Sequence, residues 1–137
     1  MLFEQAELTR EIRSDSKERK FLAKLYKYNM YLQDMRDVIY QWKTSEASEY
    51  LFINEMEALL SKAFVNYEKK RATLLEFLEA IPCFSTYKIL KLRYVEFKKF
   101  SQISKETNYC MQSVFNYHRK GLDWVKKELE KKEELCL

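Results

Sequence analysis

The chain has very few of the residues that form turns and reactive sites. Its 137 residues include one glycine, one proline, one histidine and three cysteines. A β-rich or loop-rich protein needs more turn residues than this, so the sequence indicates an all-α protein. One glycine cannot build a phosphate-binding loop, and the single histidine has no partners at catalytic or metal-ligand spacing. The carboxylates form no evident catalytic pair, so we expect no catalytic residue, no metal, no cofactor and no enzyme activity.

The cysteines are scattered along the chain, and its apolar residues form no long uninterrupted run. Cys83, Cys110 and Cys136 form no C-x-x-C motif, which argues against a disulfide framework or a zinc site. Free thiols fit a reducing cytoplasm. We expect no secretory signal, because Met1 is followed by a mixed, charged stretch. No apolar run approaches the roughly 18 residues that a membrane span requires, so we expect a cytoplasmic protein with no membrane partner.

Positive charge is concentrated in one part of the chain. The formal net charge is +4, and residues 83–127 carry ten Lys or Arg against three Asp or Glu, which gives +7. Residues 1–82 give −1 and residues 128–137 give −2. A local positive excess is typical of a region that binds the phosphates of nucleic acid. The alternative is a solvated basic surface without a partner.

Two long segments have apolar residues at alternating spacings of three and four, the pattern of helices that pack along each other. Over residues 17–43 the pattern comprises Phe21, Leu25, Tyr28, Leu32, Met35, Ile39 and Trp42. Over residues 49–81 it comprises Ile53, Met56, Leu60, Ala63, Tyr67, Leu74, Phe77 and Ile81, and Lys70 is its only break. The two segments predict a long, coiled-coil-like antiparallel helical hairpin.

Polar residues and the proline predict where these helices begin and end. Ser14–Ser16 contains side chains that cap helix N-termini. The polar stretch 44–48 predicts a turn, with Ser45 or Ser48 as the next N-cap. Pro82 should end the second helix, because the residue before a proline disfavours the α conformation. Ser85 or Thr86 can then cap the helix that follows.

The first part of the chain, residues 1–82, is predicted to be a dimerisation or partner-binding region. Residues 1–13 form either a short helix or an arm. The apolar faces of residues 17–81 are wider than a single seam between two helices can bury, so we expect a homodimer. The second helix is longer than the first, and its projecting end must pack on another element through Leu74, Leu75, Phe77 and Leu78.

The C-terminal region, residues 83–137, contains three amphipathic segments in quick succession. The first is Tyr87–Phe97, and the second is Phe100–Thr107, with Phe100 and Ile103 one turn apart. The third starts near Cys110 and has Val114, Tyr117 or His118, Gly121-Leu122 and Val125 at helical spacing. Asn108 is the best non-glycine candidate for a left-handed turn residue between the last two. The arrangement predicts a helix-turn-helix unit.

The motifs of this region resemble those of a known family. The chain has Leu92-Arg93-Tyr94, Phe100-x-x-Ile103-Ser104, Asn108-Tyr109 and Val114-x-x-x-His118-x-x-Gly121-Leu122. They are similar to LRYRY, W-x-x-I-A, G-Y and V-x-x-x-H-x-x-A-L of the RinA-like phage transcriptional regulators, whose relatives are the ArpU-like regulators. They also resemble region four of bacterial sigma factors. The chain departs from this pattern at four positions. Ser104 and Gly121 stand where the family has Ala, Thr107 stands where it has an apolar residue, and Asn108 stands where it has Gly.

The resemblance, which covers roughly residues 85–127, implies a phage or prophage transcriptional regulator. Such a protein acts in the cytoplasm of the bacterial host and binds promoter DNA, which is double-stranded. In these families, residues at the start and on the outer face of the last helix enter the major groove. The corresponding DNA-binding candidates are Met111, Gln112, Ser113, Phe115, Asn116, Arg119 and Lys120, with Lys98 and Lys99 beside the groove.

Alternative functions use the same residues differently. Met111 and Phe115 are apolar and predicted to point outward, so this face is also suited to RNA polymerase or another protein. A third alternative is a structural helical protein. Arg93 either belongs to the basic cluster or forms a structural ion pair with Glu106. His118 is either a helix-packing residue or a phosphate donor.

Overall fold

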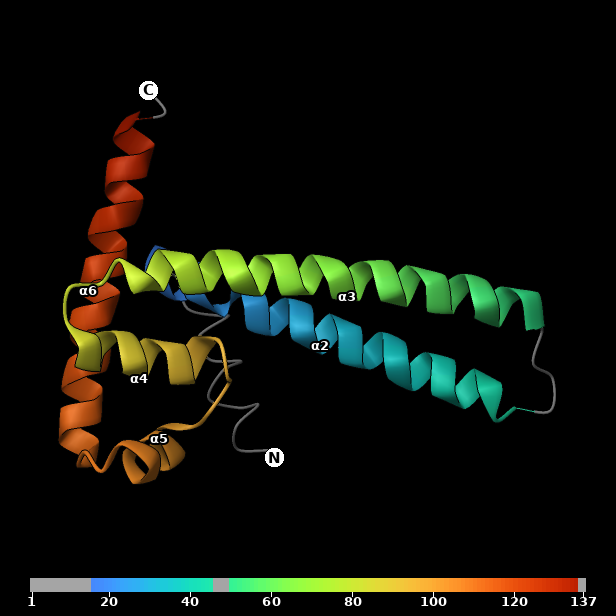
Figure 1. The fold of residues 1–137 in the computed structure, drawn as a ribbon, viewed down its shortest axis with the longest axis horizontal. Coiled ribbons are helices and arrows are strands. Elements are labelled where there is room, and N and C mark those ends of the chain that lie inside the picture. Colours follow the sequence, from blue (N-terminus) through green and yellow to red (C-terminus); the bar gives the residue numbers. More distant parts are fainter. Residues whose placement is uncertain (1–15, 46–49, 136–137) are drawn as a thin grey trace.

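A computed structural model describes residues 16–45 and 50–135. The described residues form helices and no strand (Figure 1): α2 (Lys17–Lys43), α3 (Tyr50–Glu79), α4 (Phe84–Tyr94), α5 (Phe100–Thr107) and α6 (Met111–Leu135). The all-α prediction is confirmed. No helix in this part of the chain has the length and apolar character needed to cross a membrane. The predictions for residues 1–13, for Ser48 and for Cys136 lie outside the described residues.

Helices α2 and α3 run antiparallel along each other (Figure 1). Rings far apart in sequence meet between them: Phe21 and Phe77 have centroids 5.0 Å apart, and Tyr28 and Tyr67 stack at 6.4 Å. The Tyr28 hydroxyl also donates to the Ala63 carbonyl at 3.2 Å. The predicted serine cap of α2 is Ser16, whose side chain accepts from the Arg19 N–H at 3.3 Å. The heptad residues buried in this seam are Leu25, Leu32, Ile39, Ile53, Tyr67 and Leu74.

The start of α4 differs from the prediction. Ser85 and Thr86 were expected to cap this helix, but both lie within its first turn. The N-cap is Cys83, whose backbone is extended and whose side chain makes no capping hydrogen bond. The cap prediction was wrong because the helix begins earlier, at Phe84, where the Cys83 carbonyl accepts from the Tyr87 N–H at 3.0 Å.

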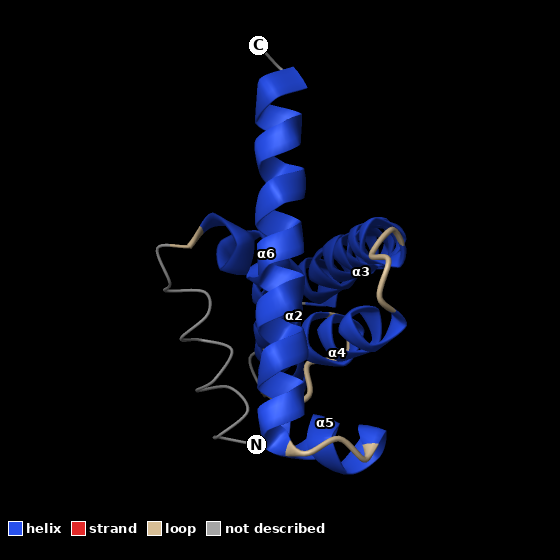
Figure 2. Cartoon of the chain, turned by 90° about the vertical axis from the view of Figure 1, so that its left-hand side faces the viewer, coloured by secondary structure: helices blue, strands red, loops and turns tan. Residues whose placement is uncertain are grey.

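The end of α3 packs on α4 and α6. Leu74 and Leu78 share one core with Leu90, on α4, and with Val125, on α6. The Phe77 ring also meets the Trp124 ring edge-on, with centroids 5.4 Å apart. This core continues across residue 82, so it joins the α2–α3 pair to the three later helices. Figure 2 shows α6 standing across the end of the pair, with α5 at its N-terminal end. We call residues 84–122 the head.

Helices α4 and α6 approach closely at the only glycine in the chain. A Cβ on Gly121 would lie 2.6 Å from Cδ1 and 2.8 Å from Cγ of Leu90. Glycine inside a helix costs about 1 kcal/mol relative to alanine. The glycine therefore allows a contact between the two helices that an alanine would crowd.

Candidate nucleic-acid interface

The head closes around a small core of its own. Ile89 and Leu92 from α4 meet Ile103 from α5 and Val114 from α6, and all four side chains are buried. Partly buried rings surround them, namely Phe100, Tyr109 and Tyr117. Ile103 and Val114 thus hold α5 and α6 together, as the helical spacing indicated.

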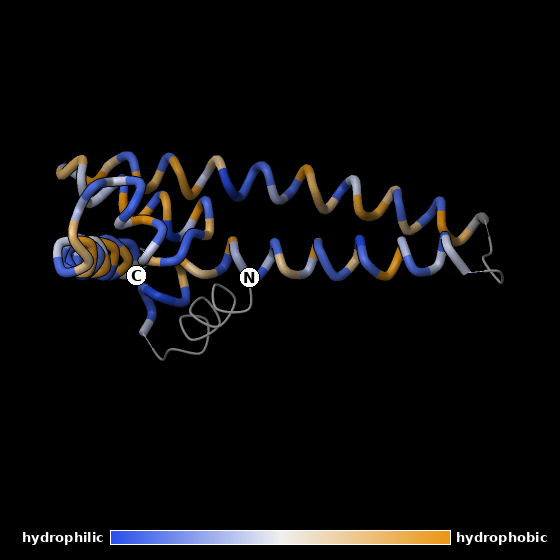
Figure 3. Tube along the Cα trace, turned by 90° about the horizontal axis from the view of Figure 1, so that it is seen from below, coloured by the Kyte–Doolittle hydropathy of each residue, from blue (hydrophilic) through white to orange (hydrophobic). Residues whose placement is uncertain are grey.

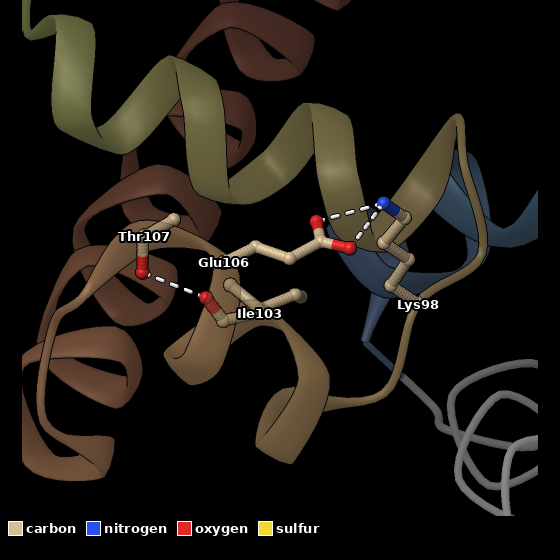
Figure 4. Close-up of polar contacts among 4 residues, drawn as sticks. All are labelled: Lys98, Ile103, Glu106 and Thr107. Atoms are coloured by element: carbon tan, nitrogen blue, oxygen red, sulfur yellow. Dashed lines mark hydrogen bonds and ion pairs between the residues drawn. The ribbon is translucent and has the colours of Figure 1, made fainter.

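The connection between α5 and α6 is a tight turn held by side-chain hydroxyls. Asn108 is left-handed, with φ 59° and ψ 19°, as predicted. The Ser104 hydroxyl donates to the Tyr109 carbonyl at 2.6 Å. The Thr107 hydroxyl donates to the Ile103 carbonyl at 2.7 Å (Figure 4) and accepts from the Tyr109 N–H at 3.4 Å. The hydroxyls of Ser104 and Thr107 therefore hold the turn between the two helices.

The first turns of α6 present an exposed face at one end of the molecule (Figures 1 and 2). Met111 and Phe115 are 38% and 43% exposed. The same face carries exposed Gln112, Asn116, Arg119 and Lys120, whereas Ser113 is half-buried. The opposite side of this helix is buried through Val114, His118, Gly121 and Leu122. The predicted outward register is therefore present, with Ser113 at its edge.

Phe115 is held in place although it is exposed. Its ring meets the Phe100 ring edge-on at 5.1 Å. Phe100 in turn contacts His118 at 5.0 Å and lies 4.1 Å from the guanidinium carbon of Arg93. An aromatic side chain supported in this way contributes a rigid apolar contact to a binding surface.

Lys98 is engaged by a neighbouring carboxylate (Figure 4). Its ammonium lies 2.6 Å and 2.7 Å from the two carboxylate oxygens of Glu106. The Glu106 carboxylate raises the pKa of Lys98, and the pair fixes the loop before α5 to the end of that helix. Lys99 is the N-cap residue of α5, and its carbonyl accepts from the N–H groups of Gln102 and Ile103 at 3.0 Å. The two lysines predicted to contact phosphate thus differ in their surroundings.

Arg93 lies inside the head and not on its surface. It is 1% exposed, and its guanidinium donates to the Lys98 carbonyl at 3.1 Å and covers the Phe100 ring. Glu106, the carboxylate proposed as a partner for Arg93, forms an ion pair with Lys98. A buried guanidinium is unsuited to a phosphate contact, so Arg93 does not belong to the basic surface cluster.

His118 is a packing residue. It is buried, its Nε2 lies 2.6 Å from the Tyr94 hydroxyl, and the two rings stack with centroids 5.7 Å apart. Burial, and then the positive charges of Arg93 and Arg19, lower the pKa of His118 to about 3. The imidazole is therefore neutral near pH 7, which fits the helix-packing alternative.

Sequence reasoning missed a left-handed residue in the loop between α4 and α5. Phe97 has φ 60°, in the left-handed region that large side chains rarely adopt. Its ring packs edge-on against Tyr26 at 5.3 Å, and the N–H of Lys98 donates to the Leu92 carbonyl across the turn. No sequence signal marks such a residue, because glycine or asparagine is the usual choice there.

Within the described ranges no group of three or more His, Cys, Asp and Glu side chains could hold a metal ion. The site therefore consists of a rigid helix face with amides, two apolar side chains and flanking cations. Comparisons with protein-family models, curated proteins and solved structures found nothing that matches this chain.

Proposed function

We propose that the protein is a phage or prophage transcriptional regulator that binds promoter DNA through α5, the turn and α6, used as a helix-turn-helix unit. The α2–α3 pair then serves as a coiled-coil-like hairpin for assembly. One observation carries the proposal: an exposed face with two amide side chains lies at the start of a helix whose opposite face is locked in a core. A helix so presented fits the major groove.

The chemistry of this face suits base reading. Gln112 and Asn116 lie one turn apart, and each can form two hydrogen bonds with an adenine edge. Met111 and Phe115 can contact thymine methyl groups. Arg119 and Lys120 follow on the same exposed side and suit phosphates. Lys99, at the start of α5, and the +7 charge of residues 83–127 add phosphate attraction.

A second candidate function is binding to RNA polymerase or another protein through the same face. The exposure of Met111 and Phe115 favours it, because supported aromatic side chains are typical anchors of protein interfaces. In this case the protein has little DNA affinity of its own.

Selection of bound fragments from a random DNA pool, with the full chain, tests the proposal. The expected result is an enriched site whose affinity falls steeply with salt, because bound lysines and arginines release counterions. Lys120→Ala should weaken binding, whereas Lys69→Ala, an equal charge change on the exposed side of α3, should not. Failure of the intact protein to bind any DNA at low salt would favour the protein-binding function.

A further inference from the structure

The α2–α3 pair carries a second apolar stripe beside its buried seam. Four large side chains each stand one residue before a seam residue: Tyr31 before Leu32, Val38 before Ile39, Phe52 before Ile53 and Leu59 before Leu60. Their exposed fractions are 57%, 39%, 42% and 54%, in that order. A seam between two helices accounts for the buried residues but leaves these four facing water.

The stripes of the two helices lie on the same side of the pair. In two antiparallel helices, residues that precede the seam residues point to one common side. The ring contact between Trp42 and Phe52, with centroids 4.6 Å apart, agrees with this placement. On each helix the stripe follows spacings of four, three and four. We call it the outer face, and its members are Tyr31, Met35, Val38, Trp42, Phe52, Met56, Leu59 and Ala63.

The other side of the pair is mostly polar. The residues that directly follow Leu32, Ile39, Ile53, Leu60 and Tyr67 are Gln33, Tyr40, Asn54, Ser61 and Glu68, and the exposed rings on this side are Tyr40 and Phe64. None of the eight members of the outer face is charged, whereas polar residues dominate this second side. Figure 3 shows hydrophobic positions recurring along both helices where they extend away from the head. A contiguous apolar surface of this kind marks an interaction site.

We propose that a second copy of this chain packs on the outer face, so that two helix pairs form a four-helix bundle. Apolar heptad stripes on both helices are the surface that four-helix packing buries, and an identical stripe supplies matching spacing. The face is about 16 Å long and 20 Å wide from helix geometry. This footprint of roughly 320 Å² per partner places the contact in the small class of interfaces, below about 1,200 Å² in total, so the dimer should form in the micromolar range.

The charges at its borders indicate how the copies are oriented. At the head end, Lys24 and Lys70 are exposed beside the rings of Phe21 and Tyr28. A copy pointing the same way would bring the partner's Lys70 against Lys24. A copy pointing the opposite way avoids this repulsion and places the partner's Lys62 opposite Glu55, since both residues border Leu59 on α3. We therefore infer that the two hairpin tips point in opposite directions.

Light scattering of the full chain across the micromolar range tests the interface without DNA, so its outcome is independent of the proposed function. The expected mass is that of a dimer. Val38→Glu with Leu59→Glu should give a monomer, because charges on exposed positions disrupt the contact but spare the fold. Gln33→Glu with Ser61→Glu adds the same charge to the polar side and should remain dimeric.

Circular dichroism checks that both double variants keep the helical content of the wild type. A wild-type chain that is monomeric at every concentration would overturn the proposal. So would a dimer that survives Val38→Glu with Leu59→Glu.

Charge reversal tests the orientation. Glu55→Lys should raise the concentration at which the dimer forms, and adding Lys62→Glu should restore it, because the pair is then reversed on both copies. A double variant that dimerises no better than Glu55→Lys alone would overturn the opposed arrangement.

Discussion

Gly121 on α6 lies directly against Leu90 on α4, so that a single added carbon would come within 2.6 Å of the leucine side chain. Gly121→Ala should therefore destabilise the protein by about 1–3 kcal/mol through overpacking, which outweighs the gain of about 1 kcal/mol in helix propensity. Urea denaturation measures the difference. Adding Leu90→Val should recover part of the loss by making room, and a more stable Gly121→Ala variant would show that Leu90 yields freely.

Replacing Ile103 tests the small core of the head. Ile103→Asp places an unpaired charge among buried side chains, and the head should lose its helical order. Hydrogen exchange of the backbone amides in residues 85–127 measures this loss. The neighbouring Ser101→Asp is exposed at the start of α5 and should leave protection unchanged. Unchanged protection in Ile103→Asp would contradict the assignment of this core.

The buried histidine predicts how stability depends on pH. The pKa of His118 is lowered from 6.5 to about 3 in the folded chain, so the unfolded chain binds an extra proton between these values. Stability is then fully present above pH 6.5 and falls as the pH drops below it, by at most about 1.4 kcal/mol per pH unit. Urea denaturation from pH 7 to pH 5 should show this fall in the wild type. His118→Gln should show a shallower one, and equal slopes would contradict the prediction.

Base reading and phosphate binding should fail differently when residues are removed. Gln112→Ala or Asn116→Ala should cost roughly 1–3 kcal/mol on the preferred site and relax its sequence preference. Lys99→Ala should instead weaken binding to all DNA and reduce the salt slope by about one unit. Lys98→Ala is a less clean test, because it also frees the Glu106 carboxylate.

Affinity for a selected and a scrambled site, each at several salt concentrations, separates the two classes. A uniform loss in Gln112→Ala and Asn116→Ala, with no change in preference, would mean that the outward face of α6 does not read bases.

The sequence predicted those parts of the fold that depend on local rules. The bounds Lys17–Lys43 and Phe100–Thr107 match α2 and α5, because caps, turn residues and helical periodicity act over a few residues. The same periodicity predicted which side of α6 is exposed. Spacings of three and four define a stripe but not which of its edges faces the neighbouring helix. Trp42 therefore looked like a seam residue and lies on the outer face.

Tertiary contacts could not be predicted in this way. Arg93 is basic, and its burial depends on the Phe100 ring and on a carbonyl five residues along the chain. The Lys98–Glu106 pair joins residues eight positions apart across a loop. Phe97 takes a left-handed backbone that its residue type disfavours, and its contact with Tyr26 lies about seventy positions away in sequence. Each depends on the assembled fold, which local patterns do not encode.

Because one core crosses residue 82, we expect the head and the α2–α3 pair to unfold as one cooperative unit. Leu90, Tyr94 and Val125 are buried against residues of that pair, including Leu22 and Leu78. A fragment that began at residue 83 would expose these side chains to water, so it should aggregate or melt at a lower temperature than the full chain. Unfolding of the hairpin would then also unfold the head and remove the surface at the start of α6. A substitution that destabilises the hairpin should therefore lower the amount of binding-competent protein in the cell.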